Sequence, residues 1–531
     1  MTKLPLTLTA CAFLLIQHDA FSIDFVFGDG STTVTNPAGF GAGDSLTFQG
    51  NLSVTAGHAV QLTPVPSSIS LTFNGGSTTG TSAAGQDGVS ILNPFDGMFT
   101  NNGTIFSTLD EGVSFEDVVS GTVINNGTIT GGDTALNFAD DVSGMVINRG
   151  TIDGMDHGLD FDEDLDGTAI NRGTIIGRTE DGVEIENDLD GTFINWGTIQ
   201  GGNGGENSGL AIRDDLDTTG QLINHGSIMG FRNGVVVSDN VFGSLVNRGT
   251  IIGPQRSGIG IGDDLRSGGS ISNYGTIIGQ RFGIDIIDQL AGTIFNCGVI
   301  EGTDQAGISA DRTNGVIRNH GGRIQGGNRA IALGGQNGTV ILSGPSHIVG
   351  NIQGGAGGGD VIRFENMRGI SAAQEAQLVA LAAADSTAQT TITLFGETIN
   401  WINFEDVQVD ASSLETYSSV LTGPGLQQFA TSLDNINGLN DALRGLLKGL
   451  NDANPALLNE LASNASGQGQ ANALQDFARN QDTRLYSLLS NQIFEPSRQH
   501  LRSAFADCRG YPHRALHPGG AGRCHGSCSL G

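Results

Sequence analysis

The sequence predicts an all-β protein: a right-handed parallel β-helix with coils of about 23 residues, followed by a C-terminal α-helical segment. Three observations lead to this prediction. A short motif recurs at nearly constant spacing, apolar residues alternate with polar ones at period two inside each copy, and 83 of the 531 residues are glycine. Glycine at this density disfavours helices, and a leucine-rich repeat would need a Leu-dominated pattern that this sequence lacks.

The motif is Asn-x-Gly-(Thr/Ser)-Ile, and the last two copies along the chain match it more loosely. The copies begin at Asn101, Asn125, Asn148, Asn171, Asn195, Asn224, Asn247, Asn273, Asn296 and Asn319. Subtraction of successive numbers gives spacings of 24, 23, 23, 24, 29, 23, 26, 23 and 23. A second short run, such as 158–161 or 182–185, follows each motif and is also β-branched or aromatic, so each coil should contain two or three strands. The right hand comes from the general chirality of parallel connections.

Equivalent residues of stacked coils should lie ~4.8 Å apart. The Asn side chains are expected to form one inward row, bonded to one another or to turn backbone. A second, apolar inward row should contain Ile105, Ile129, Ile152, Ile175 and Ile199. The motif glycine is expected to supply a positive φ. The variable position should face solvent; it holds Asn126, Arg149, Arg172, Trp196, His225, Arg248, Tyr274, Cys297 and His320.

Residues 1–22 have the pattern of a secretory signal peptide, with Lys3, an apolar stretch over 4–16 and Ala20. A lipoprotein cleavage box ending at Cys11 fits less well, because the apolar stretch runs through it. Residues 23–94 should form irregular first coils and a cap that covers the first open edge. Regular coils are predicted over 95–365, and a helical excursion with the last coils over 366–412.

Residues 413–500 are predicted to be an α-helical linker segment, because Leu and other apolar residues recur there at steps of three and four. A plain helical hairpin docked on the last coil is the competing interpretation. Residues 501–531 have no periodicity and are expected to be a disordered tail translated out of frame. Cys508, Cys524, His525 and Cys528 could form a zinc site there, but we assign the tail no function.

Composition limits the partners. Lys and Arg number 25 against 55 Asp and Glu, a formal charge of −30, which argues against nucleic acid and against an anionic membrane surface. Five Cys residues give no disulfide framework. We assign no catalytic, cofactor-binding or metal-binding residue from the sequence.

The Asn-x-Gly-Thr-Ile coils, the acidic Gly-rich composition, the final G-E-T-I-N-W-I-N-F-E-D-V coil at 396–407 and the Leu-rich segment resemble the passenger of a bacterial autotransporter. The resemblance covers residues 23–500. It implies export to the cell surface, the outer membrane or the medium, with a C-terminal β-barrel as anchor. A twelve-strand barrel at about 10 residues per strand needs well over 100 residues. Since 31 residues follow His500, contact with the outer membrane is expected only through a barrel that is missing, by truncation or a frame shift.

The function expected from this resemblance is that of a non-enzymatic, adhesin-like scaffold that binds a cell-surface protein or glycan. A carbohydrate-active β-helix enzyme is the alternative. The only sizeable insertions, six residues around 201–208 and three around 254–257, are too small to wall a sugar cleft. The carboxylates recur with the repeat and do not form one isolated pair. The third possibility is that the chain is a non-functional, frame-shifted remnant. Translation of the coding DNA after His500 in the other frames would test this possibility.

Acidic residues recur after the second run of each repeat. We expect them at equivalent positions: Asp117, Asp141, Asp164, Asp188, Asp215, Asp264 and Asp288. Calcium could bridge such a column of like charges. The favoured alternative is that the carboxylates accept hydrogen bonds from turn N–H groups in solvent that screens their charge. A melting temperature unchanged by millimolar calcium after chelator treatment would exclude bridging.

Overall fold

The computed structural model describes residues 23–410, except 77, 83–84, 206, 336, 368–369 and 385–386. The predictions for 1–22, 413–500 and 501–531, including the tail cluster of Cys508, Cys524, His525 and Cys528, lie outside these residues. The chain divides into two compact units, Met1–Leu210 and Ala211–Gly531, and each is described by itself.

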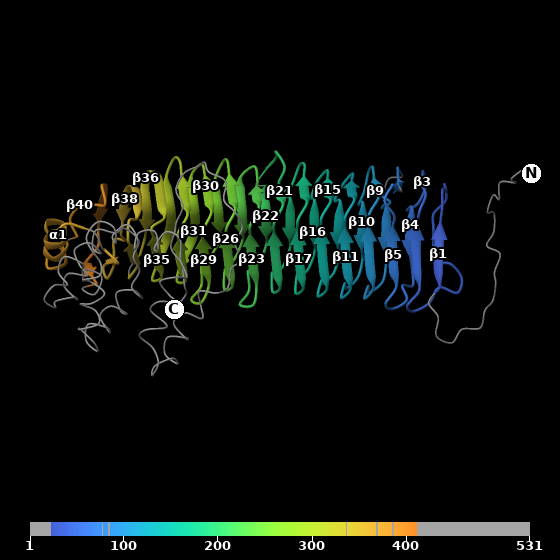
Figure 1. The fold of residues 1–531 in the computed structure, drawn as a ribbon, viewed down its shortest axis with the longest axis horizontal. Coiled ribbons are helices and arrows are strands. Elements are labelled where there is room, and N and C mark those ends of the chain that lie inside the picture. Colours follow the sequence, from blue (N-terminus) through green and yellow to red (C-terminus); the bar gives the residue numbers. More distant parts are fainter. Residues whose placement is uncertain are drawn as a thin grey trace, which may run out of the picture. The chain divides into compact units, whose positions relative to one another are not determined.

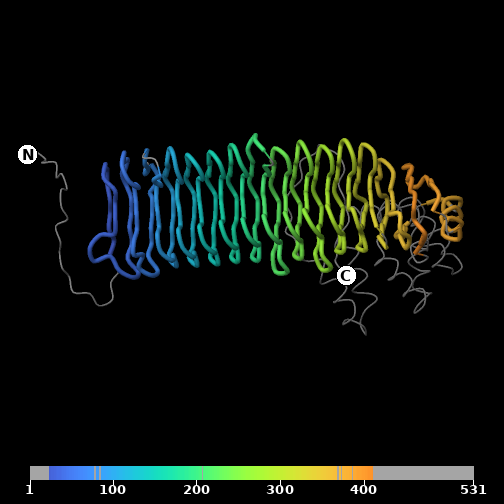
Figure 2. The backbone as a smooth tube through the Cα atoms, turned by 180° about the vertical axis from the view of Figure 1, so that it is seen from behind, coloured from blue at the N-terminus to red at the C-terminus, as the bar shows by residue number. Residues whose placement is uncertain are grey.

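Both units are parallel β-solenoids with coils of ~24 residues, as the repeat predicts (Figures 1 and 2). In the first unit each coil from β2 (Ser45–Phe48) onward contributes three short strands, and the coil before it contributes one. The first strands, which pair with one another, are β1 (Asp24–Phe27), β2 (Ser45–Phe48), β5 (Ser70–Phe73), β8 (Met98–Asn101), β11 (Thr122–Asn125), β14 (Met145–Asn148), β17 (Thr168–Asn171) and β20 (Thr192–Asn195). The coils thus begin before residue 95, with ordinary parallel pairing of β1, β2 and β5.

The second and third strands of these coils form the other sheet of the solenoid. The second strands are β3 (Leu52–Val54), β6 (Thr78–Thr81), β9 (Thr104–Ser107), β12 (Thr128–Gly131), β15 (Thr151–Gly154), β18 (Thr174–Gly177) and β21 (Thr198–Gln200). The third strands are β4 (Val60–Leu62), β7 (Val89–Ile91), β10 (Val113–Phe115), β13 (Leu136–Phe138), β16 (Leu159–Phe161) and β19 (Val183–Ile185). Strand β22 (Ser208–Ile212) contains the boundary between the units.

The second unit repeats the arrangement. Its first strands are β23 (Gln221–Asn224), β26 (Ser244–Asn247), β29 (Ser270–Asn273), β32 (Thr293–Asn296), β35 (Val316–His320), β37 (Thr339–Ser343), β39 (Val361–Glu365) and β42 (Asp406–Val409). Its second and third strands are β24 (Ser227–Met229), β25 (Asn233–Val237), β27 (Thr250–Gly253), β28 (Ser257–Ile261), β30 (Thr276–Gly279), β31 (Phe282–Leu290), β33 (Val299–Gly302) and β34 (Ala306–Thr313). In the last coils β36 (Arg323–Leu333) and β38 (His347–Gln353) run through both positions.

The predicted helical excursion is α1 (Ala372–Ala382), which begins at the N-cap Ser371 with a capping box to Gln374. The strands that follow differ from the prediction of plain coils. Strand β40 (Thr390–Leu394) pairs antiparallel with β41 (Glu397–Ile402). The turn between them has φ of 54° at Phe395 and 84° at Gly396, two positive values in succession that fold a chain into a hairpin. Only β41 and β42 continue the parallel pairing.

The interior of the first unit contains a ladder of phenylalanine rings. The ring centroids of Phe115 and Phe138 lie 5.1 Å apart, and those of Phe138 and Phe161 also 5.1 Å apart, with nearly parallel planes. All three side chains are fully buried. The period-two alternation of the third strands therefore places their first and third residues inside, and the stacking adds a favourable ring contact at every coil.

Phe138→Ala is expected to lower the free energy of unfolding by about 3–5 kcal/mol, because it removes two ring contacts and leaves a cavity in a core that cannot close around it. Urea denaturation followed by far-UV circular dichroism measures the change. Thr130→Ala, on the neighbouring strand and half-buried, is the matched control. A loss no larger than that of the control would contradict the ladder.

Candidate functional site

The motif asparagines form a continuous hydrogen-bonded ladder inside each unit. In the first unit each Nδ2 donates to Oδ1 of the next coil's asparagine, at 2.8 Å from Asn101 to Asn125 and 2.9 Å from Asn125 to Asn148. The same bonds join Asn148, Asn171 and Asn195 at 2.9 Å. In the second unit the ladder joins Asn224, Asn247, Asn273, Asn296 and Asn319, at 2.7–2.9 Å.

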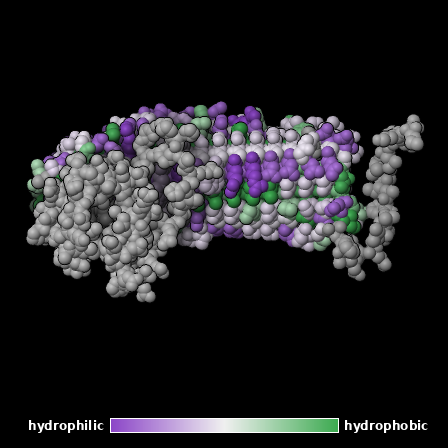
Figure 3. All heavy atoms as spheres, viewed as in Figure 1, coloured by the Kyte–Doolittle hydropathy of each residue, from purple (hydrophilic) through white to green (hydrophobic). Residues whose placement is uncertain are grey.

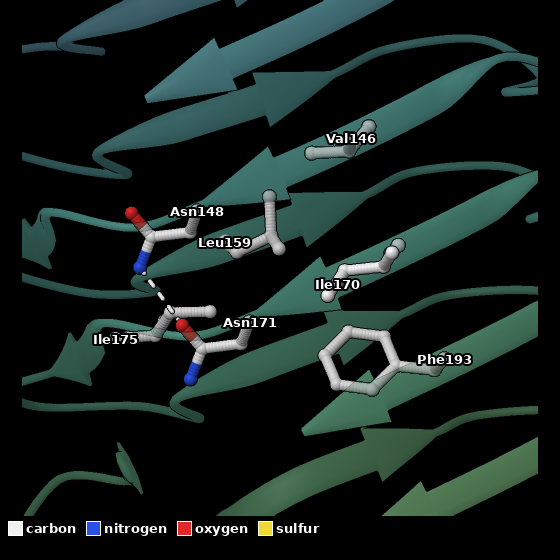
Figure 4. A pocket seen from close by; sticks show the side chains of 8 residues that line it. Val146, Asn148, Leu159, Ile170, Asn171, Ile175 and Phe193 are labelled. Atoms are coloured by element: carbon white, nitrogen blue, oxygen red, sulfur yellow. Dashed lines mark hydrogen bonds between the residues drawn. The ribbon is translucent and has the colours of Figure 1, made fainter. Parts of the chain in front are cut away.

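Each ladder amide is also tied to the backbone. Asn148 Oδ1 accepts from the N–H of Gly150 at 3.2 Å, and its Nδ2 also donates to the Thr174 carbonyl at 3.2 Å. The ten motif asparagines that form the two ladders are all at most 2% exposed. The adjacent apolar row, Ile105, Ile129, Ile152, Ile175 and Ile199, is fully buried. Figure 4 shows the bond between Asn148 and Asn171 beside Ile175 and Phe193, around an interior space with no room for a water molecule.

The positive φ predicted for the motif glycine is found in the last copy, at Gly321, and is wrong for the other copies. Gly127, Gly150 and Gly173 do not have positive φ. A Cβ on Gly150 would lie 1.9 Å from the carbonyl oxygen of Gly127, and one on Gly173 would lie 1.9 Å from that of Gly150. Glycine is needed here because the backbones of successive coils approach closely at the turn, which a sequence pattern cannot distinguish from a need for left-handed backbone.

The variable position faces solvent in most coils, but Cys297 is an exception. Arg149, Arg172 and Trp196 are exposed, and Trp196 retains 52% of its accessible surface. Cys297 is 6% exposed, and its Sγ lies 3.2 Å from the carbonyl oxygen of His320. The next coil carries an extra glycine after His320, with φ of 67° at Gly321, which changes the turn that stacks against Cys297. His225, Tyr274 and His320 are half-buried.

The outer side of the first strands in the first unit combines apolar and cationic residues. Ile124, Ile147 and Ile170 are register partners and half-buried, because their side chains alternate with the inward residues. Arg172 and Trp196 directly follow the paired residues Asn171 and Asn195, so they are neighbours one coil apart. In the first unit, Figure 3 shows hydrophilic and hydrophobic residues gathered in rows across successive coils. We call Ile124, Ile147, Ile170, Arg149, Arg172 and Trp196 the outer wall.

The acidic turns of the first unit occupy two columns and not one. The bridges Val119↔Val142 and Val142↔Leu165 place Asp141 and Asp164 in register, each directly before a bridged residue. Asp117 lies one residue earlier and aligns with Asp140. The prediction of one column was wrong because two adjacent positions are often acidic, and a one-residue slip is invisible in the sequence.

The same slip separates Asp264 from Asp288 in the second unit, because the bridge Leu265↔Leu290 aligns Asp264 with Gln289. The carboxylates accept backbone hydrogen bonds. Asp164 N–H donates to Asp141 at 3.4 Å, and Gln289 N–H donates to Asp264 at 2.7 Å. Arg266 Nη1 lies 2.8 Å from Asp264. These contacts favour the turn-capping alternative, while calcium binding stays a prediction.

Two clusters of titratable residues lie on the third-strand side of the first unit, and neither was predicted. Asp87, Asp110 and Glu111 place carboxylate oxygens within 4.8 Å of one another. Burial raises the pKa of Glu111, and hydrogen bonds with Asp110 and Asp87 raise it further, to about 9. The second cluster contains His157, Asp160 and Glu184. Burial lowers the pKa of His157, but the two carboxylates raise it, to about 11 overall.

Raising the pH from 5 to 9 is expected to destabilise the first unit through Glu111. Because its folded pKa is raised, the folded chain keeps a proton that the unfolded chain loses near pH 4.5, so this stability is lost as the pH rises towards 9. Glu111→Gln should flatten the dependence, measured as urea midpoints at both pH values. The exposed Glu163→Gln is the control. Equal slopes in the wild type and Glu111→Gln would contradict the raised pKa.

The second cluster could have been found by aligning the third strands, since the residues 158–161 and 182–185 place Asp160 over Glu184. Register pairing of Leu159 with Val183 and of Phe161 with Ile185 confirms that alignment. His157 lies outside the repeated run, and nothing in the sequence connects it with Glu184.

No helix within the described residues is long and apolar enough to cross a membrane. No protein-family model, curated protein or solved structure matches the chain.

Proposed function

We propose that the chain is an exported, autotransporter-type passenger that binds a cell-surface protein or glycan through its outer wall and catalyses no reaction. The single observation that carries this proposal is the exposed Trp196, held on the regular coil next to Arg172. Aromatic and arginine side chains carry much of the binding energy at recognition surfaces. On an acidic chain of formal charge −30, a row with Arg149 and Arg172 is a local exception.

The ladder supports this use of the outer surface. Trp196 follows Asn195, whose side chain accepts from Asn171 and from the N–H of Gly197. A side chain at such a position starts from a rigid backbone, so binding orders few groups and costs less entropy. The Ile row beside it offers half-buried apolar area that a partner could cover.

Binding is tested with fluorescently labelled full-length chain on epithelial cells, before and after enzymatic removal of surface glycans. Trp196→Ala combined with Arg172→Ala should reduce retained label at least about tenfold, as loss of a hot spot does. The matched control is Asn126→Ala, at the same motif position in another coil. Loss of binding after deglycosylation identifies a glycan; retention identifies a protein. Equal retention of the double variant and the control would overturn the outer wall as the binding surface.

Export is tested separately by expressing the full chain in a Gram-negative host. The N-terminal sequence of the exported form should begin close to residue 23, after removal of the signal peptide. A full-length chain confined to the cytoplasm would refute the export part of the proposal. Depolymerisation of acidic polysaccharides, lost on mutation of one carboxylate cluster, would favour the carbohydrate-active alternative.

A further inference from the structure

The cluster of His157, Asp160 and Glu184 has the composition and the placement of a metal site. Asp160 and Glu184 occupy the middle positions of β16 and β19 and are register partners one coil apart. The residues beside them, Leu159 and Phe161, point into the core, so the two carboxylates point away from it. They are buried all the same: Asp160 is 8% exposed and Glu184 is 2% exposed.

Two buried carboxylates at the spacing of paired strands repel one another and need positive charge. His157 forms an ion pair with each of them. Its Nδ1 lies 3.3 Å from Asp160 Oδ2, and its Nε2 lies 2.8 Å from Glu184 Oε2 and 3.4 Å from Glu180 Oε2. The imidazole of His157 therefore lies between Asp160 and Glu184, where positive charge is favoured.

The hydrogen bonding of the cluster is also incomplete. Within the described residues, Asp160 Oδ1 and His157 Nε2 are buried atoms without a hydrogen-bond partner. Because Nε2 forms an ion pair with Glu184, the atom of the cluster that is left without any partner is Asp160 Oδ1. Buried polar atoms of this kind are rare and call for an explanation, such as an ion.

We propose that His157, Asp160 and Glu184 bind one divalent transition-metal ion. One ligand atom from each residue lies within 4.8 Å of the other two. Ligands of a shared ion at about 2.0–2.2 Å are separated by ~3 Å, so the carboxylates need little movement. The imidazole must turn so that one nitrogen points between them. An imidazole with two carboxylates suits zinc, cobalt or manganese better than calcium, which prefers oxygen ligands alone.

The previous coil supplies variants that fit the fold. Asn137 is the register partner of Asp160. Thr134 precedes Leu136 by two residues, as His157 precedes Leu159, so it occupies the equivalent place. Asp160→Asn and His157→Thr therefore introduce the residues that the preceding coil already has at the equivalent positions, Asn137 and Thr134. Either variant removes a ligand without changing the backbone pattern.

The test is calorimetric titration of the chelator-treated full chain with CoCl2, together with the absorption spectrum of bound cobalt. We expect a site without thiolate bands whose affinity falls at least about tenfold in Asp160→Asn and in His157→Thr. The exposed Glu163→Gln and His225→Gln, which lies in the second unit, should bind as the wild type does. Cobalt should also raise the melting temperature of the wild type but not of the two ligand variants.

Cobalt bound through Cys508, Cys524 or Cys528 would show intense near-ultraviolet thiolate bands and would persist in both ligand variants. If this is the only binding observed, or if no cobalt binds, the proposal is overturned. The same holds if the site without thiolate bands keeps its affinity in Asp160→Asn and His157→Thr.

Discussion

Gly173→Ala is expected to lower the free energy of unfolding of the first unit by about 4–5 kcal/mol or more, an effect at the upper end of single substitutions. The added Cβ would lie 1.9 Å from the carbonyl oxygen of Gly150 and 2.9 Å from its carbonyl carbon. Both atoms belong to the backbone of the preceding coil. Backbone held by ladder bonds on both sides cannot move away as a flexible side chain can, so the two coils must separate locally.

The comparison that isolates this effect is Gly28→Ala in the same unit. A Cβ on Gly28 would have no neighbour within 4 Å, and its φ is not positive. Alanine there should be neutral or slightly stabilising, because it reduces the freedom of the unfolded chain. Urea denaturation of the full chain, followed by circular dichroism, measures both. If Gly173→Ala unfolds at the same urea concentration as Gly28→Ala, the close approach of the coils is not a constraint.

In a solenoid, a destabilising substitution acts mainly on the coils next to it. Each coil contacts its neighbours only, so stability is a sum of coil terms and of interfaces between adjacent coils. Separating the coils at Gly150 and Gly173 removes one interface and leaves the others intact. Hydrogen exchange should therefore show lost protection in β14, β17 and their coils before it shows loss in β5.

The sequence predicts the inner structure of the coils well, because a period-two pattern decides which side chains face inward. Asn148 and Ile152 lie where the motif places them, and the second run forms the third strand. The reason for Gly150 could not be predicted, because both left-handed backbone and close contact between coils select glycine. Asp117 was misplaced for a related reason: its neighbours are also polar, so nothing in the pattern fixes the register.

The outer features depend on contacts between coils that no local pattern encodes. Cys297 is buried because the turn of the next coil is one residue longer, with Gly321 and Gly322 where the coil of Cys297 has the single Gly298. The antiparallel pairing of β40 with β41 depends on the positive φ of Phe395, an uncommon conformation for an aromatic residue. His157 and Glu184 are 27 residues apart and meet because one coil lies on the next.

Asn148→Leu is the second substitution with a large expected effect. It removes the donor to Asn171 and Thr174 and the acceptor for Asn125 and Gly150. The loss should be about 3–5 kcal/mol, since each buried group left without a partner costs about 1–3 kcal/mol and leucine replaces none of them. Asn126→Ala, in the preceding repeat and exposed, should change stability by less than about 0.5 kcal/mol.

A double-mutant cycle distinguishes a hydrogen-bonded ladder from a set of independently buried amides. Asn125 and Asn148 share a bond of 2.9 Å, so each single leucine variant leaves the other amide with an unmet partner. The double variant removes both partners and should cost about 1–2 kcal/mol less than the sum of the singles. Asn125 and Asn195 are three coils apart, about 14 Å at ~4.8 Å per coil, and should be additive. Additivity of the adjacent pair would mean that the coils gain nothing from the bonds between their asparagines, and that burial alone holds those side chains inside.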